Sequence, residues 1–105
     1  MRKFVAFLSD KNKDLFSEQL LLAHIKHLQQ LDASGKLHLC GPFTDNDSAI
    51  QILMVQNIEE ATALVNQDPF VHYGYYKTVE IKELIEANAD NNWLTSHPQT
   101  EEKRN

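Results

Sequence analysis

The sequence of 105 residues has little of what secreted, membrane-spanning or nucleotide-binding proteins depend on. Its one cysteine, Cys40, has no second cysteine to pair with, so nothing indicates an oxidising compartment. No apolar run approaches the roughly 20 residues of a membrane-spanning helix. The three glycines form no glycine-rich phosphate loop, which disfavours nucleotide-dependent chemistry. We therefore expect a cytoplasmic protein with no membrane partner.

Positive charge is also scarce, because the sequence has 10 lysines and arginines and 15 aspartates and glutamates. The net charge of −5 disfavours nucleic acid as a partner, since binding it requires a basic patch. Metal-binding signatures such as Cys-x-x-Cys are missing. The close spacing of His24 with His27, and of His38 with Cys40, is a weak substitute for them. We expect no metal and no cofactor.

Hydrophobic periodicity and turn residues predict six elements in the order strand, helix, strand, strand, helix, strand. The strands are expected over residues 3–9, 36–40, 49–55 and 75–82. The first helix is expected to begin near Asp14 or Ser17 and to end around residues 34–35, and the second to run from 57 to an interruption at 68–70. This order is typical of the α+β ferredoxin-like (βαββαβ) fold, a four-stranded antiparallel sheet with two helices on one face.

The predicted fold leaves one face of the sheet without helices. Apolar side chains on that face need cover, and a homodimer that packs sheet against sheet provides it. We assign residues 1–83 to this domain. The polar remainder, residues 84–105, forms a C-terminal extension that we expect to be disordered from about residue 97.

The first predicted helix carries a histidine on its apolar side. At about 100° per residue, its apolar side chains fall on one arc of roughly 140°: Leu20, Leu21, Ile25, Leu28 and Leu31. His24 lies inside this arc, and His27 lies outside its edge. A buried imidazole needs a hydrogen-bond partner, because an unpaired buried polar group costs about 1–3 kcal/mol. A main-chain carbonyl would satisfy the ring, and so would a side chain from elsewhere in the chain.

An ordered set of short motifs resembles the YCII-related (YciI-like) family of the dimeric α+β barrel superfamily. The set comprises His24 with Leu28 and Leu31, Gly35, Gly41-Pro42-Phe43, Glu59-Glu60-Ala61, and Asp68-Pro69-Phe70 with Gly74. The match extends over about residues 1–83. The resemblance implies a ferredoxin-like subunit that dimerises as an α+β barrel. It also implies an active site in which His24 pairs with Asp68.

Two positions depart from the family pattern. Relatives often carry an arginine three residues before the histidine, where this sequence has Leu21. Many also have glycine after the Gly-Pro turn, where this sequence has Asp47-Ser48-Ala49. A substrate anion that such an arginine would hold lacks that contact here.

The implied pair of His24 and Asp68 suits proton transfer. A carboxylate on one ring nitrogen fixes the tautomer and raises the basicity of the ring, which leaves the other nitrogen free to move a proton. Asp68 before Pro69 is also a good helix N-cap, a role that needs no catalysis. The expected pocket-lining residues are Gly41, Pro42, Ser48, Phe70 and Tyr75.

We therefore expect a small cytoplasmic enzyme that acts on an unknown small organic molecule. His24 would be the general acid/base and Asp68 its orienting carboxylate, in a lyase or isomerase reaction. Better-understood relatives suggest a dehydrochlorinase-like activity. The alternative is a non-catalytic dimer that binds a small molecule or docks on another protein, and Leu21 in place of arginine favours it.

Overall fold

The computed structural model describes residues 1–98, and its strands and longer helices follow the order that the sequence predicts. The elements are β1 (Arg2–Lys11), η1 (Lys13–Leu15), α1 (Glu18–Ala33), β2 (Leu37–Pro42), β3 (Ala49–Val55), α2 (Ile58–Gln67), α3 (Pro69–His72), β4 (Tyr76–Leu84) and η2 (Ala89–Leu94). The predicted α+β, ferredoxin-like fold class is confirmed. The second predicted helix is α2, which ends at Gln67, and the predicted interruption is confirmed because the chain is extended at Asp68. Pro69 then starts a further short helix, α3.

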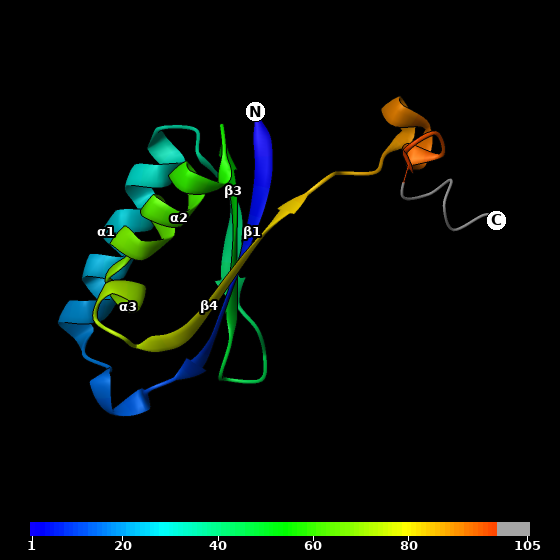
Figure 1. The fold of residues 1–105 in the computed structure, drawn as a ribbon. Helices are drawn as coiled ribbons and strands as arrows, with labels where there is room; N and C mark the ends of the chain where they lie inside the picture. Colours follow the sequence, from blue (N-terminus) through cyan, green and yellow to red (C-terminus); the bar gives the residue numbers. More distant parts are fainter. Residues whose placement is uncertain (99–105) are drawn as a thin grey trace.

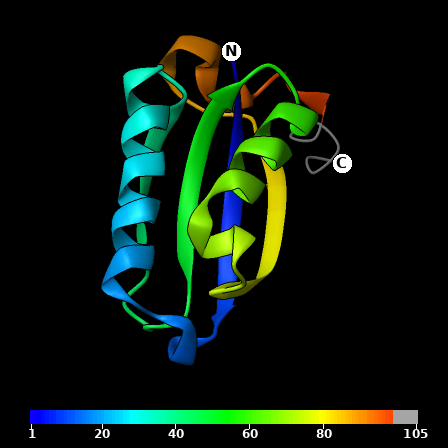
Figure 2. The same cartoon turned by 90° about the vertical axis from the view of Figure 1, so that its left-hand side faces the viewer.

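The four strands form one antiparallel sheet in the order β2-β3-β1-β4. All three α-helices cover the same face of this sheet (Figure 1), with α1 lying beside α2 and α3 (Figure 2). The core fills the layer between helices and sheet and is built from alternate strand residues and the inner helix faces. Its members include Phe4, Ala6, Leu8, Leu31, Leu53, Val55, Ala61, Val65 and Phe70.

The opposite face of the sheet carries no α-helix from the described part of the chain (Figure 1). Because Phe4, Ala6 and Leu8 point into the core, the alternate residue Phe7 points to this open face, where it is 41% exposed. Ile52 and Met54 of β3 occupy the same face for the same reason. The homodimer that would cover these side chains stays a prediction.

A β-bulge in β2 changes which of its residues face inward. The sequence pattern places Leu37 and Leu39 on one face, but the register shifts between them. Leu37 pairs with Leu53 and packs on the core, whereas Leu39 pairs with Ile52 and is exposed. The bulge brings Cys40 opposite Gln51, on the inner face of the sheet.

Residues after β4 lead away from the body of the molecule (Figure 1). The predicted boundary at residue 83 lies one residue before β4 ends. Asn88 and Asn91 cap η2 reciprocally, side chain to backbone. The sequence predicts disorder from about residue 97. Most of that segment, from residue 99 on, lies outside the described residues. Among residues 1–98, no helix combines the length and apolar character needed to cross a membrane.

Candidate functional site

His24 is carried by the middle of α1 and faces the sheet. Ser17 is the N-cap of this helix, and its hydroxyl accepts a hydrogen bond from the Leu20 N–H at 3.0 Å. This cap fixes where the helical period starts, and the period turns His24 toward the interior. Its side chain is 15% exposed, so the ring is mostly buried but still reaches the site's open side.

Asp68 occupies the junction between α2 and α3. Its backbone is extended, and its side chain caps α3 by accepting the Phe70 N–H at 2.9 Å. Pro69 takes the first helical position, where a missing N–H does no harm. The carboxylate is fully buried, with 0% of its side chain exposed. The capping role expected from the sequence is therefore present.

The same carboxylate contacts the imidazole. His24 Nδ1 lies 2.8 Å from Asp68 Oδ1 and 2.9 Å from Oδ2. Because a carboxylate only accepts, Nδ1 must carry the proton. Gln51 Nε2 donates a third hydrogen bond, 2.7 Å long, to Oδ2. Three donors thus surround the buried carboxylate, which is what a charge removed from water requires.

Phe70 fixes the plane of the histidine ring. The two rings are stacked, with centroids 3.9 Å apart and planes inclined by 11°. Phe70 in turn packs on Tyr75 and Tyr76, at centroid distances of 4.5 and 5.9 Å. The Asp-Pro-Phe motif therefore supplies both the hydrogen-bond partner of His24 and the surface on which its ring rests.

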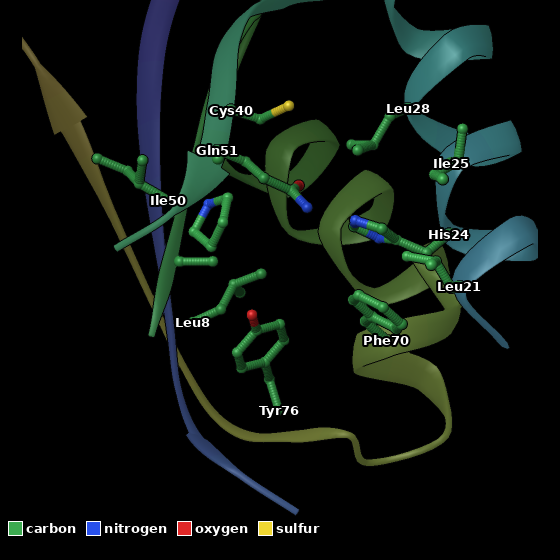
Figure 3. A pocket seen from close by; sticks show the side chains of 13 residues that line it. Leu8, Leu21, His24, Ile25, Leu28, Cys40, Ile50, Gln51, Phe70 and Tyr76 are labelled. Carbon is green, nitrogen blue, oxygen red and sulfur yellow. The ribbon is translucent and has the colours of Figure 1, made fainter. Parts of the chain in front are cut away.

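A cavity of about 280 Å³ opens beside this pair. His24, Gln51 and Tyr76 reach it from three different elements (Figure 3). Most of its wall is apolar. The wall comprises Leu8, Leu21, His24, Ile25, Leu28, Cys40, Gly41, Pro42, Ala49, Ile50, Gln51, Phe70 and Tyr76. A small organic molecule fits this mixture of apolar walls and few polar groups.

Two titratable groups of the wall are held in their protonated forms at neutral pH. Burial, with smaller contributions from Tyr75 and Asp68, raises the pKa of Tyr76 to about 12. The Tyr76 O–H is therefore a hydrogen-bond donor. Burial and the charge of Asp68 also raise the pKa of the Cys40 thiol. A raised pKa disfavours the thiolate, which argues against Cys40 as a nucleophile.

Of the residues predicted to line the pocket, Gly41, Pro42 and Phe70 do so. Ser48 and Tyr75 lie elsewhere. The Ser48 hydroxyl donates to Asp45 Oδ2 at 2.7 Å within the turn between β2 and β3. Tyr75 packs between Phe16 and Phe70, and the next residue, Tyr76, reaches the cavity instead.

Gln51 is a second polar residue of the site, besides Tyr76, that the sequence did not predict. It lies in the middle of β3, is only 2% exposed and bonds directly to Asp68. The available signal was a lone amide in the nearly continuous apolar run of residues 49–55. A buried polar side chain in such a run requires a partner.

Leu21 stands at the position where relatives often carry an arginine. Leu21 lines the cavity, so that position supplies apolar surface in place of a positive charge. Within residues 1–98, no group of three His, Cys, Asp or Glu side chains is arranged to hold a metal ion.

Comparison with known proteins identifies the family of the chain. The model of the YCII-related domain matches residues 3–85. The chain belongs to the YCII-related domain family. This YCII-related protein is also 29% identical, over 59 residues, to the uncharacterised protein YjpA of Bacillus subtilis. That alignment covers 56% of the chain and 69% of YjpA.

A solved structure shares the fold of this YCII-related protein. It is 5-chloro-2-hydroxyhydroquinone dehydrochlorinase (TftG) from Burkholderia phenoliruptrix, in complex with 2,5-dihydroxybenzoquinone. The match has a TM-score of 0.60 and covers 86% of this chain and 99% of the dehydrochlorinase. The sequence identity is 20%, so the likeness establishes the common fold and no more.

Proposed function

We propose that this YCII-related protein is a cofactor-independent enzyme that transfers a proton on a small organic molecule. The observation that carries the proposal is the bonding of His24. Its Nδ1–H is held by the buried Asp68 carboxylate, while Nε2 makes no hydrogen bond within residues 1–98. The ring lines a cavity of about 280 Å³. His24 would be the catalytic residue, and Asp68 its positioning residue.

The arrangement suits a base that afterwards becomes an acid. With Nδ1 protonated, Nε2 of the neutral ring holds a lone pair and accepts a proton from a C–H bond of the bound molecule. The Asp68 carboxylate then stabilises the imidazolium that forms, as an orienting carboxylate does in related pairs. Stacking on Phe70 keeps the ring in one plane during both steps.

Two reaction types follow from this proton transfer. In an elimination, the electron pair of the broken C–H bond forms a double bond while a leaving group such as chloride departs. In an isomerisation, Nε2 returns the proton to a different carbon. The name of the structural neighbour, a dehydrochlorinase, describes a reaction of the first type in that protein. We propose the same class for this chain, with a different or undetermined substrate.

The proposal includes a homodimer and a cytoplasmic location. Phe7, Ile52 and Met54 supply the open sheet face with apolar surface that a second copy would bury. The single cysteine supports a reducing compartment.

The test is a search for proton exchange in D₂O. Chlorinated hydroxyhydroquinones and small carbonyl compounds are incubated with the protein, and NMR and chloride release report deuterium uptake and elimination. We expect His24→Gln to abolish whichever activity is found. The matched control is His27→Gln, because His27 lies one turn further along α1 and does not line the cavity.

A non-catalytic binding protein is the second candidate, and Leu21 at the cavity wall favours it. In that case His24→Gln would leave no activity to lose and would mainly lower the melting temperature. Activity that survives in His24→Gln, with the fold intact, would contradict the proposed role of the ring.

A further inference from the structure

Only one of the two polar atoms of the Gln51 side chain has a hydrogen-bond partner. Its Nε2 donates to Asp68 Oδ2 at 2.7 Å. Its Oε1 is buried yet has no hydrogen-bond partner in the described part of the chain. Buried side-chain oxygens in folded proteins nearly always have a partner, so an orphaned one marks a place where something else binds.

The amide cannot exchange its two ends. Rotation by 180° would place Oε1 against the Asp68 carboxylate, and two acceptors cannot bond. His24 Nδ1 and the Phe70 N–H already donate to that carboxylate, which keeps it an acceptor. The atom that lacks a partner is therefore always the acceptor Oε1. The amide cannot turn its N–H₂ group toward a ligand that offers only acceptors.

Gln51 belongs to the cavity wall that also carries His24. Figure 3 shows its amide reaching from β3 toward the side chains of His24 and Leu28. Less than 1 Å² of the oxygen is exposed, so neither bulk water nor water in the unaltered cavity touches it. A donor on a molecule held in the cavity reaches Oε1 when a side chain of the wall shifts and uncovers it.

The size and walls of the cavity limit what that molecule is. Its volume of about 280 Å³ is roughly twice that of a cavity that accepts benzene, about 150 Å³. Leu8, Leu21, Ile25 and Leu28 make the remaining surface apolar. A compact and mostly apolar molecule matches these properties.

We infer that Gln51 is the specificity-determining residue of this site. Its Oε1 accepts a hydrogen bond from an O–H or N–H group of a compact, mostly apolar ligand, and selects such ligands over shape-matched ones without a donor. In naming a substrate class, the inference rests on the proposed function of the site. The experiment below measures binding alone, so the two are tested separately.

The test compares phenol with toluene, which has nearly the same shape but no donor. Affinities for the wild-type full chain and for Gln51→Met are measured by NMR titration. We expect the ratio of phenol to toluene affinity to fall about tenfold in Gln51→Met, because one buried hydrogen bond is lost. Loss of the Asp68 contact affects both probes alike and cancels in the ratio. Gln29→Met, on the exposed side of α1, should leave the ratio unchanged.

A measurement on the wild type covers the case in which Gln51→Met does not fold. The ¹³C resonance of the Gln51 side-chain carbonyl should shift with phenol and not with toluene. An unchanged ratio in folded Gln51→Met, or the same carbonyl shift with both probes, overturns the inference.

The two proposals fail in different ways. If phenol is preferred through Gln51 but no proton transfer depends on His24, the ligand class stands and the proposed function falls. If proton transfer depends on His24 and the preference is missing, only the role of Gln51 falls.

Discussion

His24 on α1 and Asp68, 44 residues later in the chain, meet at 2.8 Å between Nδ1 and Oδ1. The contact joins the longest helix to the junction of the two others and lies beside the cavity. It therefore serves both the packing of the subunit and the proposed chemistry, and the predictions below separate these two contributions.

Removal of the buried carboxylate should destabilise the fold strongly. In Asp68→Ala, the cap of α3 and the partners of His24 and Gln51 are lost together. We expect the free energy of unfolding to fall by about 3–5 kcal/mol, as when one partner of a buried pair is removed. Urea denaturation measures it. The comparison is Asp45→Ala, an exposed aspartate that also accepts hydrogen bonds in a turn. Equal losses in the two variants would contradict the account.

Tyr76 should make stability depend on alkaline pH. Its pKa is raised to about 12 in the fold, mainly by burial, against about 10 in an unfolded chain. The folded state keeps the Tyr76 proton to a higher pH than the unfolded state does. The contribution of Tyr76 to the free energy of unfolding is therefore complete below pH 10 and is lost as the pH rises toward about 12. At pH 11 the loss of stability amounts to about 1 kcal/mol. Denaturation of wild type and Tyr76→Phe at pH 9 and pH 11 should show the extra loss in the wild type only.

Leu21→Arg should give the cavity an affinity for anions. Leu21 lines the cavity, and relatives often carry an arginine at this position, so a guanidinium there would face the bound molecule. We expect benzoate binding to strengthen about tenfold or more, measured by calorimetric titration. Leu22→Arg is the control, because Leu22 is 58% exposed and does not line the cavity. A similar gain in Leu22→Arg would show that net charge alone is responsible.

Phe7→Lys should weaken the proposed homodimer. A lysine on the open sheet face would place a charge where the second copy packs. Analytical ultracentrifugation of the wild type is expected to give a dimer, and of Phe7→Lys a monomer at the same concentration. Leu22→Lys makes an equivalent change on the helix face and should stay dimeric. A monomeric wild type would remove the dimer from the account.

The sequence predicted the fold because its hydrophobic periods are local. The apolar arc of the first helix already turned His24 inward, and the order of elements specified the sheet. Asp68 emerged only through the family motif, since no local pattern shows which distant carboxylate a buried histidine meets.

The remaining site residues depend on tertiary details. A bulge in β2 decided the side on which Cys40 lies, and the strand pairing decided that Gln51 faces Asp68. The choice between Tyr75 and Tyr76 depended on where β4 leaves the α3 turn. None of these is visible in periodicity.

The tautomer of His24 tests the central claim most directly. Long-range ¹H–¹⁵N correlation NMR of the neutral ring reports which nitrogen carries the proton. The account predicts a proton on Nδ1, facing Asp68, with Nε2 unprotonated beside the cavity. A neutral ring protonated on Nε2 would leave no base at the cavity, and the proposed proton transfer would have to be abandoned.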